Sequence, residues 1–185
     1  MSRSPREVAE QVRRMVAGEG VDFADLFAPD GVLTYPFGLP GQPDELRGRE
    51  AIRAYFAGRR GARDLLVMEG VEAVVRQTDD PEVVVTEITH HGYSKAASQP
   101  YRHTALGVIR VRDGEIVRYD DYMNPIATAR LLGRTSELAA ALSANQTSAN
   151  QTSANQTSAD QTSADQTSAD QTSADQSKKA DQSKE

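Results

Sequence analysis

The sequence predicts an α+β fold, in which helices pack across one face of a curved antiparallel sheet. The first observation is the order of the elements, which is helix, helix, strand, helix and then four long strands. The second is the alternation of apolar and polar side chains along those later segments, which is typical of strands with one buried face. Such a sheet would form a cone with a deep pocket. A flat, open-faced sandwich is the alternative.

The first third of the chain contains the helical patterns. The first helix begins with Ser4, Pro5 and Glu7, which supply a capping box and a proline in the first turn. Gly18 is predicted to end it, because glycine tolerates the backbone found beyond a helix terminus. The elements predicted here are a helix over 4–18, a short helix over 21–31, a strand over 32–37, a loop over 38–48 and a helix over 49–60.

The strand patterns follow. Residues 113–114, an Asp-Gly pair between two apolar runs, indicate a tight hairpin turn, and Asn124 with Pro125 is predicted to end the last strand. Strands are predicted over 64–78, 82–94, 101–112 and 115–123, followed by a short helix over 126–133 and a terminal turn or helix over 136–142.

Residues 143–185 are predicted to be a disordered tail. They repeat the pentapeptide Ser-Ala-Asn/Asp-Gln-Thr and contain no large apolar residue. A period of five matches neither a helix face nor a strand face, and the segment cannot bury enough apolar surface to offset its ordering entropy. A single folded domain is therefore predicted over residues 1–142.

Charge and composition argue against several classes of protein. The chain carries a net charge of −6, of which the tail contributes −3, so neither part has the basic surface that nucleic-acid binding requires. No apolar run approaches the ~18 residues of a membrane span. The chain has no cysteine, which excludes disulfides and thiolate chemistry. We therefore expect a cytoplasmic protein that binds neither nucleic acid nor membrane.

Two adjacent carboxylates in the last strand are the main candidates for chemistry. Alternation places Asp121 on the same face as Tyr119 and Met123, whereas Asp120 shares the other face with Arg118. A carboxylate on an apolar face has a raised pKa unless it is hydrogen-bonded, and a raised pKa suits general acid/base catalysis. The alternative is that Asp121 only bonds the backbone or a tyrosine and shapes the sheet.

The strand over 82–94 offers a second set of polar side chains. Glu87 and His91 share one face about 13 Å apart, so both could line a pocket without sharing a proton, and His90 points to the other face. The alternative is that His91 has no role in a site and is a half-buried histidine whose hydrogen bonds are satisfied within the protein. Adjacent histidines on opposite faces cannot bind one ion together, so no metal site is expected.

Further candidates lie on two other strands. His103 shares a face with Ala105 and Gly107, and these small neighbours leave room for a ligand, although His103 could equally pack under a helix. Tyr35 could donate a hydrogen bond to a ligand carbonyl or belong to the core. No phosphate-binding loop, nucleophile elbow or cofactor motif is present.

Several motifs resemble a known family. The stretches "LFAPDGVLTYPFGLPG", "LRGREAIRAYF" and "DGEIVRYDDYMNPIATARLLG" are similar to the SnoaL-like branch of the nuclear transport factor 2 superfamily, with its cystatin-like roll, over residues 5–135. Within that branch, "TDDP" at residues 78–81, Glu87, His91-Gly92 and Met123-Asn124 resemble the phenazine-biosynthesis A/B proteins. The resemblance implies the cone-shaped fold and a homodimer. It does not identify the reaction, because this fold hosts many unrelated activities.

The resemblance also bears on single residues. The pocket acid of the phenazine proteins matches Asp121. The first-strand aspartate of ketosteroid isomerase matches Tyr35, and the oxyanion donors of that enzyme have no match, so steroid isomerisation is disfavoured. Polyether-type epoxide hydrolases of this fold also need the first-strand carboxylate and are disfavoured with it.

These observations lead to one leading hypothesis. We expect a cofactor-independent isomerase, cyclase or condensation-type enzyme of bacterial secondary metabolism that binds a hydrophobic, ring-containing molecule. The catalytic side chains would be those of Asp121, His103 and His91, and the substrate would contact Tyr35, Glu87, Tyr119 and Met123. The alternative is a non-catalytic ligand-binding or dimerisation module of the same fold.

Overall fold

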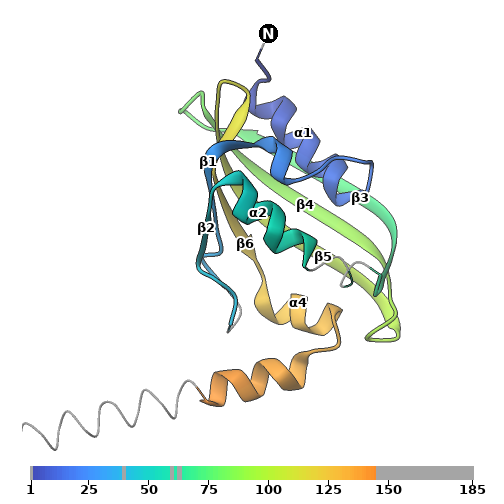
Figure 1. The fold of residues 1–185 in the computed structure, drawn as a ribbon. Helices are drawn as coiled ribbons and strands as arrows, with labels where there is room; N and C mark the ends of the chain where they lie inside the picture. Colours follow the sequence, from blue (N-terminus) through green and yellow to red (C-terminus); the bar gives the residue numbers. More distant parts are fainter. Residues whose placement is uncertain (1, 39–40, 59–60, 62–63, 145–185) are drawn as a thin grey trace, which may run out of the picture. The chain divides into compact units, whose positions relative to one another are not determined.

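The sheet consists of six strands in the order β2-β1-β6-β5-β4-β3, and α1 and α2 lie over the same face of it (Figure 1). A computed structural model of the chain describes residues 2–38, 41–58, 61 and 64–144. The chain divides into two units, residues 1–138 and 139–185, and the sheet with its covering helices belongs to the first. The elements are α1 (Pro5–Val16), η1 (Ala24–Leu26), β1 (Phe27–Thr34), β2 (Glu45–Arg47), α2 (Arg49–Ala57), β3 (Leu66–Gln77), β4 (Val83–Ser94), β5 (Gln99–Arg112), β6 (Glu115–Met123) and α4 (Pro125–Leu131).

Helix α1 begins as its sequence predicts. Oγ of Ser4 accepts a hydrogen bond from the backbone N–H of Glu7, and the Glu7 carboxylate accepts one from the backbone N–H of Ser4 at 2.7 Å. These bonds satisfy two of the N–H groups that a helix start leaves without partners. Val8, Ala9 and Val12 are buried against the sheet, and their helical spacing, rather than the cap, determines which face of α1 enters the core.

The long strands pair antiparallel, and their register defines two faces. Thr86 of β4 lies opposite Gly107 of β5, which lies opposite Asp121 of β6. Ile109 and Tyr119 form the neighbouring pair on the same face. This face, which we call the inner face, carries the core, and its buried members include Val84, Thr86, Ile88, Ile109 and Tyr119. The residues between them in sequence lie on the outer face.

The first strand covers Phe27–Thr34, earlier in the chain than the predicted 32–37. Residues 21–31 form only the short 3-10 turn η1, and β1 already begins at Phe27 because that side chain is entirely buried in the core. β1 pairs with β6 in parallel, with a register shift between Phe27 and Val32. Gly31 lies at this irregularity, where a Cβ atom would come within 2.6 Å of the Ile116 carbonyl oxygen. The predicted loop also contains the short strand β2, which pairs with β1.

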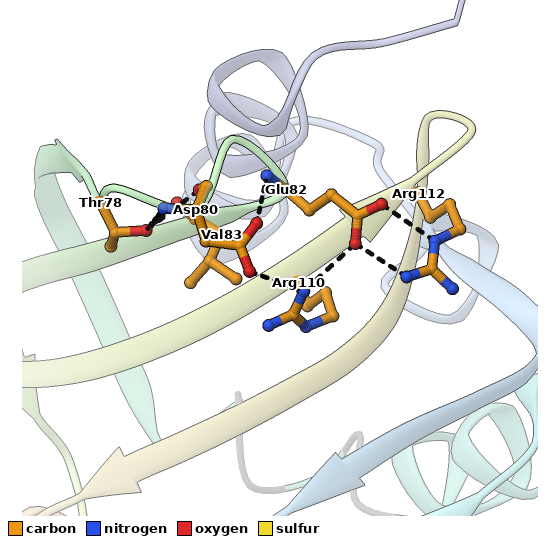
Figure 2. A network of polar contacts seen from close by, with 6 residues as sticks. All are labelled: Thr78, Asp80, Glu82, Val83, Arg110 and Arg112. Atoms are coloured by element: carbon orange, nitrogen blue, oxygen red, sulfur yellow. Dashed lines mark hydrogen bonds and ion pairs between the residues drawn. The ribbon is translucent and has the colours of Figure 1, made fainter.

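The turn between β3 and β4 is stabilised by a network of polar contacts (Figure 2). The hydroxyl of Thr78 accepts a hydrogen bond from the backbone N–H of Asp80 and donates to backbone carbonyl oxygens. Glu82 pairs with Arg110 at 3.2 Å and with Arg112 at 2.9 Å, and Asp80 pairs with Arg110 at 2.9 Å. The motif "TDDP" therefore forms a turn in which Asp80, together with Glu82 just after the motif, pairs with arginines of β5.

The end of the described chain is helical. Residues 135–144 form a helix that runs two residues beyond the boundary predicted at Leu142. The remaining repeats, from residue 145 onward, lie outside the described residues, and so does the prediction that they are disordered. Among the described helices, none combines the length and the apolar character needed to cross a membrane.

Candidate functional site

Asp121 lies on the inner face with one carboxylate oxygen buried. Oδ1 has no hydrogen-bond partner among the described residues, although the side chain as a whole is partly accessible. Burial raises the pKa of Asp121 from 3.8 to about 7. The carboxyl can therefore either accept or donate a proton near neutral pH, which is the property a general acid/base needs.

The residues around Asp121 hold it in this environment. The ring of Tyr119 packs directly against the backbone of Gly107. A Cβ atom at Gly107 would overlap Cε2 of Tyr119 and lie 2.7 Å from Oγ1 of Thr86. The pKa of Tyr119 is raised, first by its burial and then by the negative charge of Asp121. Tyr119 therefore keeps its phenolic proton at neutral pH. Gly107 is needed for this close packing, since any side chain would displace the ring.

Aromatic rings form the apolar part of the site. The ring of Phe23 packs edge-on against Phe27, Phe56 and Tyr119, with centroid distances of 5.0 to 5.7 Å. Tyr35 is 5% exposed, and its ring lies 6.0 Å from that of Tyr55 on α2. Tyr35 is thus a core residue of the inner face. Phe56 of α2 and Phe23, which directly precedes η1, supply the rings near Tyr119.

A second polar cluster occupies the other end of the inner face. His103 is 6% exposed, and its Nε2 lies 3.1 Å from Oγ1 of Thr128 on α4. The rings of His103 and His90 are 5.1 Å apart, and Nδ1 of His90 lies 3.2 Å from the Tyr101 hydroxyl. Burial lowers the pKa of His103, so this imidazole is neutral at pH 7. Met123 lies between the two ends, opposite Ala105.

The structure corrects the expected positions of Glu87 and His91. Glu87 lies opposite Leu106 on the outer face, where it pairs with Arg76 at 3.1 Å. His91 lies opposite Arg102 on the same outer face, and its ring covers Gly70 at the β3 bulge. Neither side chain shares a face with Asp121, because β4 turns its even-numbered residues inward.

The same register places His90 on the inner face, although the sequence predicted that it points away from the site. The sequence did contain an indication of the buried face of β4. Glu87 and Thr89 make its odd-numbered face the more polar one, whereas Val84 and Ile88 mark the buried face. Thr128 was also missed, since its contact with His103 joins residues far apart in sequence. Among the described residues, no three His, Cys, Asp or Glu side chains gather as a metal site would require.

The fold defines the class: small α+β proteins in which helices cover one face of a curved sheet. The sequence model of the SnoaL-like domain matches residues 8–119, more than half of the chain. The chain therefore belongs to the SnoaL-like domain family, as its motifs predict.

Individual relatives agree with this assignment. An uncharacterised PhzA/B-like protein of Pseudomonas aeruginosa is 29% identical over 126 residues, which make up 68% of this chain and 87% of the relative. A solved structure from Bacillus subtilis with a provisional isomerase name has a TM-score of 0.58 at 26% identity, covering 69% of this chain and 93% of its own. A protein of unknown function with a cystatin-like fold from Xanthomonas campestris has a TM-score of 0.55 at 12% identity, covering 71% and 100%. The predicted fold class is confirmed.

Proposed function

We propose that the protein is a cofactor-independent enzyme that moves a proton on a hydrophobic, ring-containing substrate, as isomerases, cyclases and condensation enzymes do. The observation that carries this proposal is Asp121, a carboxyl on the inner face with a buried, unpartnered Oδ1 and a pKa of about 7. A carboxyl left without a partner only to shape a sheet would cost stability for no return. The provisional isomerase name of the Bacillus subtilis relative supports the same class of reaction.

The proposed step is a proton transfer at carbon. In its ionised form Asp121 removes a proton from a carbon next to a carbonyl group, and the electron pair of the C–H bond moves onto the carbonyl oxygen as an enolate. The protonated Asp121 then returns the proton at another carbon of the same molecule, so that charge and atoms balance. Tyr119, which keeps its proton, would supply a polar contact, and the thioether side chain of Met123 and the buried ring of Tyr35 would supply apolar surface. His103 lies at the other end of the face.

The test follows proton exchange at carbon, because the natural substrate is unidentified. Purified protein is mixed in deuterated water with hydrophobic cyclic ketones, and NMR records deuterium entering next to the carbonyl. We expect Asp121→Asn to slow exchange by about 10²- to 10⁴-fold, the usual contribution of a general acid/base. Asp120→Asn is the matched control, since Asp120 points outward and bonds Thr34 and Arg118. Equal exchange by folded Asp121→Asn and wild-type protein would remove Asp121 from the chemistry.

A second candidate function is that of a dimerisation module, which the outer face favours. Leu106 is 44% exposed there and lies opposite Tyr122, whose ring contacts that of Phe37 at 5.6 Å. Arg76 pairs with Glu87 and Arg102 with Glu72, so these charges are compensated within the chain beside the exposed apolar side chains that a second copy could cover. We propose a homodimer through this face.

The oligomeric state tests this second proposal. Light scattering after size-exclusion chromatography should give a dimer for wild-type protein and a monomer for Leu106→Glu. Ile126→Glu is the control, because Ile126 is similarly exposed, at 53%, but lies on α4. A wild-type monomer, or a dimer that survives Leu106→Glu, would contradict the proposal.

A further inference from the structure

The imidazole of His103 is held in one tautomer with a free lone pair. The Thr128 hydroxyl donates its single proton to the backbone carbonyl oxygen of Asn124 at 2.9 Å. It can therefore only accept from Nε2 of His103, which must carry the ring proton. Nδ1 is then an acceptor, and it is buried with no hydrogen-bond partner among the described residues. A buried acceptor without a donor is costly unless a ligand supplies one.

This acceptor and Asp121 mark two ends of the inner face. Asp121 lies opposite Gly107, and His103 is four residues from Gly107 on β5, which places the two ends about 13 Å apart along the strand. The pair Ala105 and Met123 lies between them, and both side chains are only partly buried. The stretch between the two polar ends is therefore apolar and partly accessible.

We propose that Nδ1 of His103 binds a hydroxyl or N–H group at the end of the substrate remote from the carbon that Asp121 deprotonates. This inference rests on the proposed function and narrows its substrate class. The substrate would be an elongated apolar molecule of roughly two or three fused rings, with a hydrogen-bond donor at one end and the reacting carbonyl system at the other. His103 would thus select the substrate and orient it.

A role as proton shuttle fits the geometry less well. The ring proton of His103 is committed to Thr128, and the pair that lies between His103 and Asp121, Ala105 and Met123, cannot relay a proton. A neutral imidazole with a fixed lone pair is instead a selective acceptor, because it accepts from a hydroxyl and gains nothing from an ether or a hydrocarbon.

The test compares two matched probes, the three-ring phenol phenanthren-2-ol and its parent hydrocarbon phenanthrene. Their dissociation constants are measured by fluorescence titration of the full chain. We expect the phenol to bind wild-type protein about 3- to 10-fold more tightly, as one neutral hydrogen bond implies. In His103→Gln the ratio should fall to about one, because the amide nitrogen of Gln can still donate to Thr128 while the Nδ1 acceptor is lost. Equal affinities in wild-type protein, or no binding of either probe, would overturn the proposal.

A control separates this proposal from the acid/base function. Asp121→Asn should keep the preference for the phenol, since Asp121 lies at the other end. A preference lost in Asp121→Asn and kept in His103→Gln would overturn the assignment. Nitrogen-15 NMR adds a readout that needs no turnover, because the chain has 3 histidines. Nδ1 of His103 should be unprotonated in the free protein and shift on adding the phenol alone, and a protonated Nδ1 would overturn the proposal.

Discussion

At the scale of single residues, two adjacent aspartates have opposite environments. Asp120 accepts a hydrogen bond from the Thr34 hydroxyl at 2.5 Å and pairs with Arg118 at 2.8 Å, so its charge is compensated. Asp121, one residue later, points to the core side, and its Oδ1 has no donor among the described residues. Strand alternation alone predicts this difference, which is why the sequence was sufficient to choose between the two.

The raised pKa of Asp121 makes stability depend on pH in a defined direction. The folded carboxyl holds its proton up to about pH 7, whereas the unfolded carboxyl loses it near 3.8. The folded state therefore binds more protons between these values, and the free energy of unfolding falls as pH rises through this window, by up to about 4 kcal/mol. Below pH 4 the free energy of unfolding is not reduced by Asp121, and above pH 7 the reduction is complete.

Asp121→Asn should remove that dependence. We expect the variant to be more stable than wild-type protein at pH 8, by a few kcal/mol at most, and the difference to shrink toward pH 4. Urea unfolding at a series of pH values measures it. Parallel stability curves for the two proteins would show that Asp121 titrates normally.

At the scale of elements, local sequence patterns predicted where helices and strands begin and end better than they predicted which faces and elements meet. The capping box at Ser4, the Asp-Gly hairpin and the ends of β3 to β6 could all be located from neighbouring residues. The face of β4 was misassigned because valines occupy both faces of its first half, at Val83, Val84 and Val85. The sequence left open that His103 packs under a helix, but it could not name Thr128 of α4 as the partner, since the two residues meet across the fold.

The attachment of α4 to the sheet gives an element-scale prediction. Ser94 of β4 is fully buried, and its hydroxyl donates to the Leu131 carbonyl oxygen at 2.7 Å and accepts from the Ala97 N–H at 3.0 Å. Ser94→Ala leaves both groups without a partner and should lower the free energy of unfolding by about 1 to 3 kcal/mol. Urea denaturation checks this. The control is Ser2→Ala at an exposed position, which should change stability by less than about 0.5 kcal/mol.

At the scale of the whole molecule, the order of elements was sufficient to predict the fold class, because a run of strands after a run of helices leaves few packings. The parallel pairing of β1 with β6 was not predictable in this way. It joins residues far apart in sequence, such as Thr34 and Asp120, which are 86 positions apart and form a hydrogen bond only in the folded chain. Long-range pairing therefore completes a site that local patterns only outline.

The distribution of the core predicts how the chain tolerates truncation. Every buried apolar side chain among the described residues lies between Val8 and Leu131, and the repeats after Ala144 offer no large apolar side chain to extend that core. The tail and the rest of the chain also carry net charge of the same sign, which gives no electrostatic reason for docking. A chain ending at Ala144 should therefore keep its free energy of unfolding to within about 0.5 kcal/mol. Urea denaturation of the full and shortened chains measures this difference, and a loss of several kcal/mol would show that the repeats contribute to the folded domain.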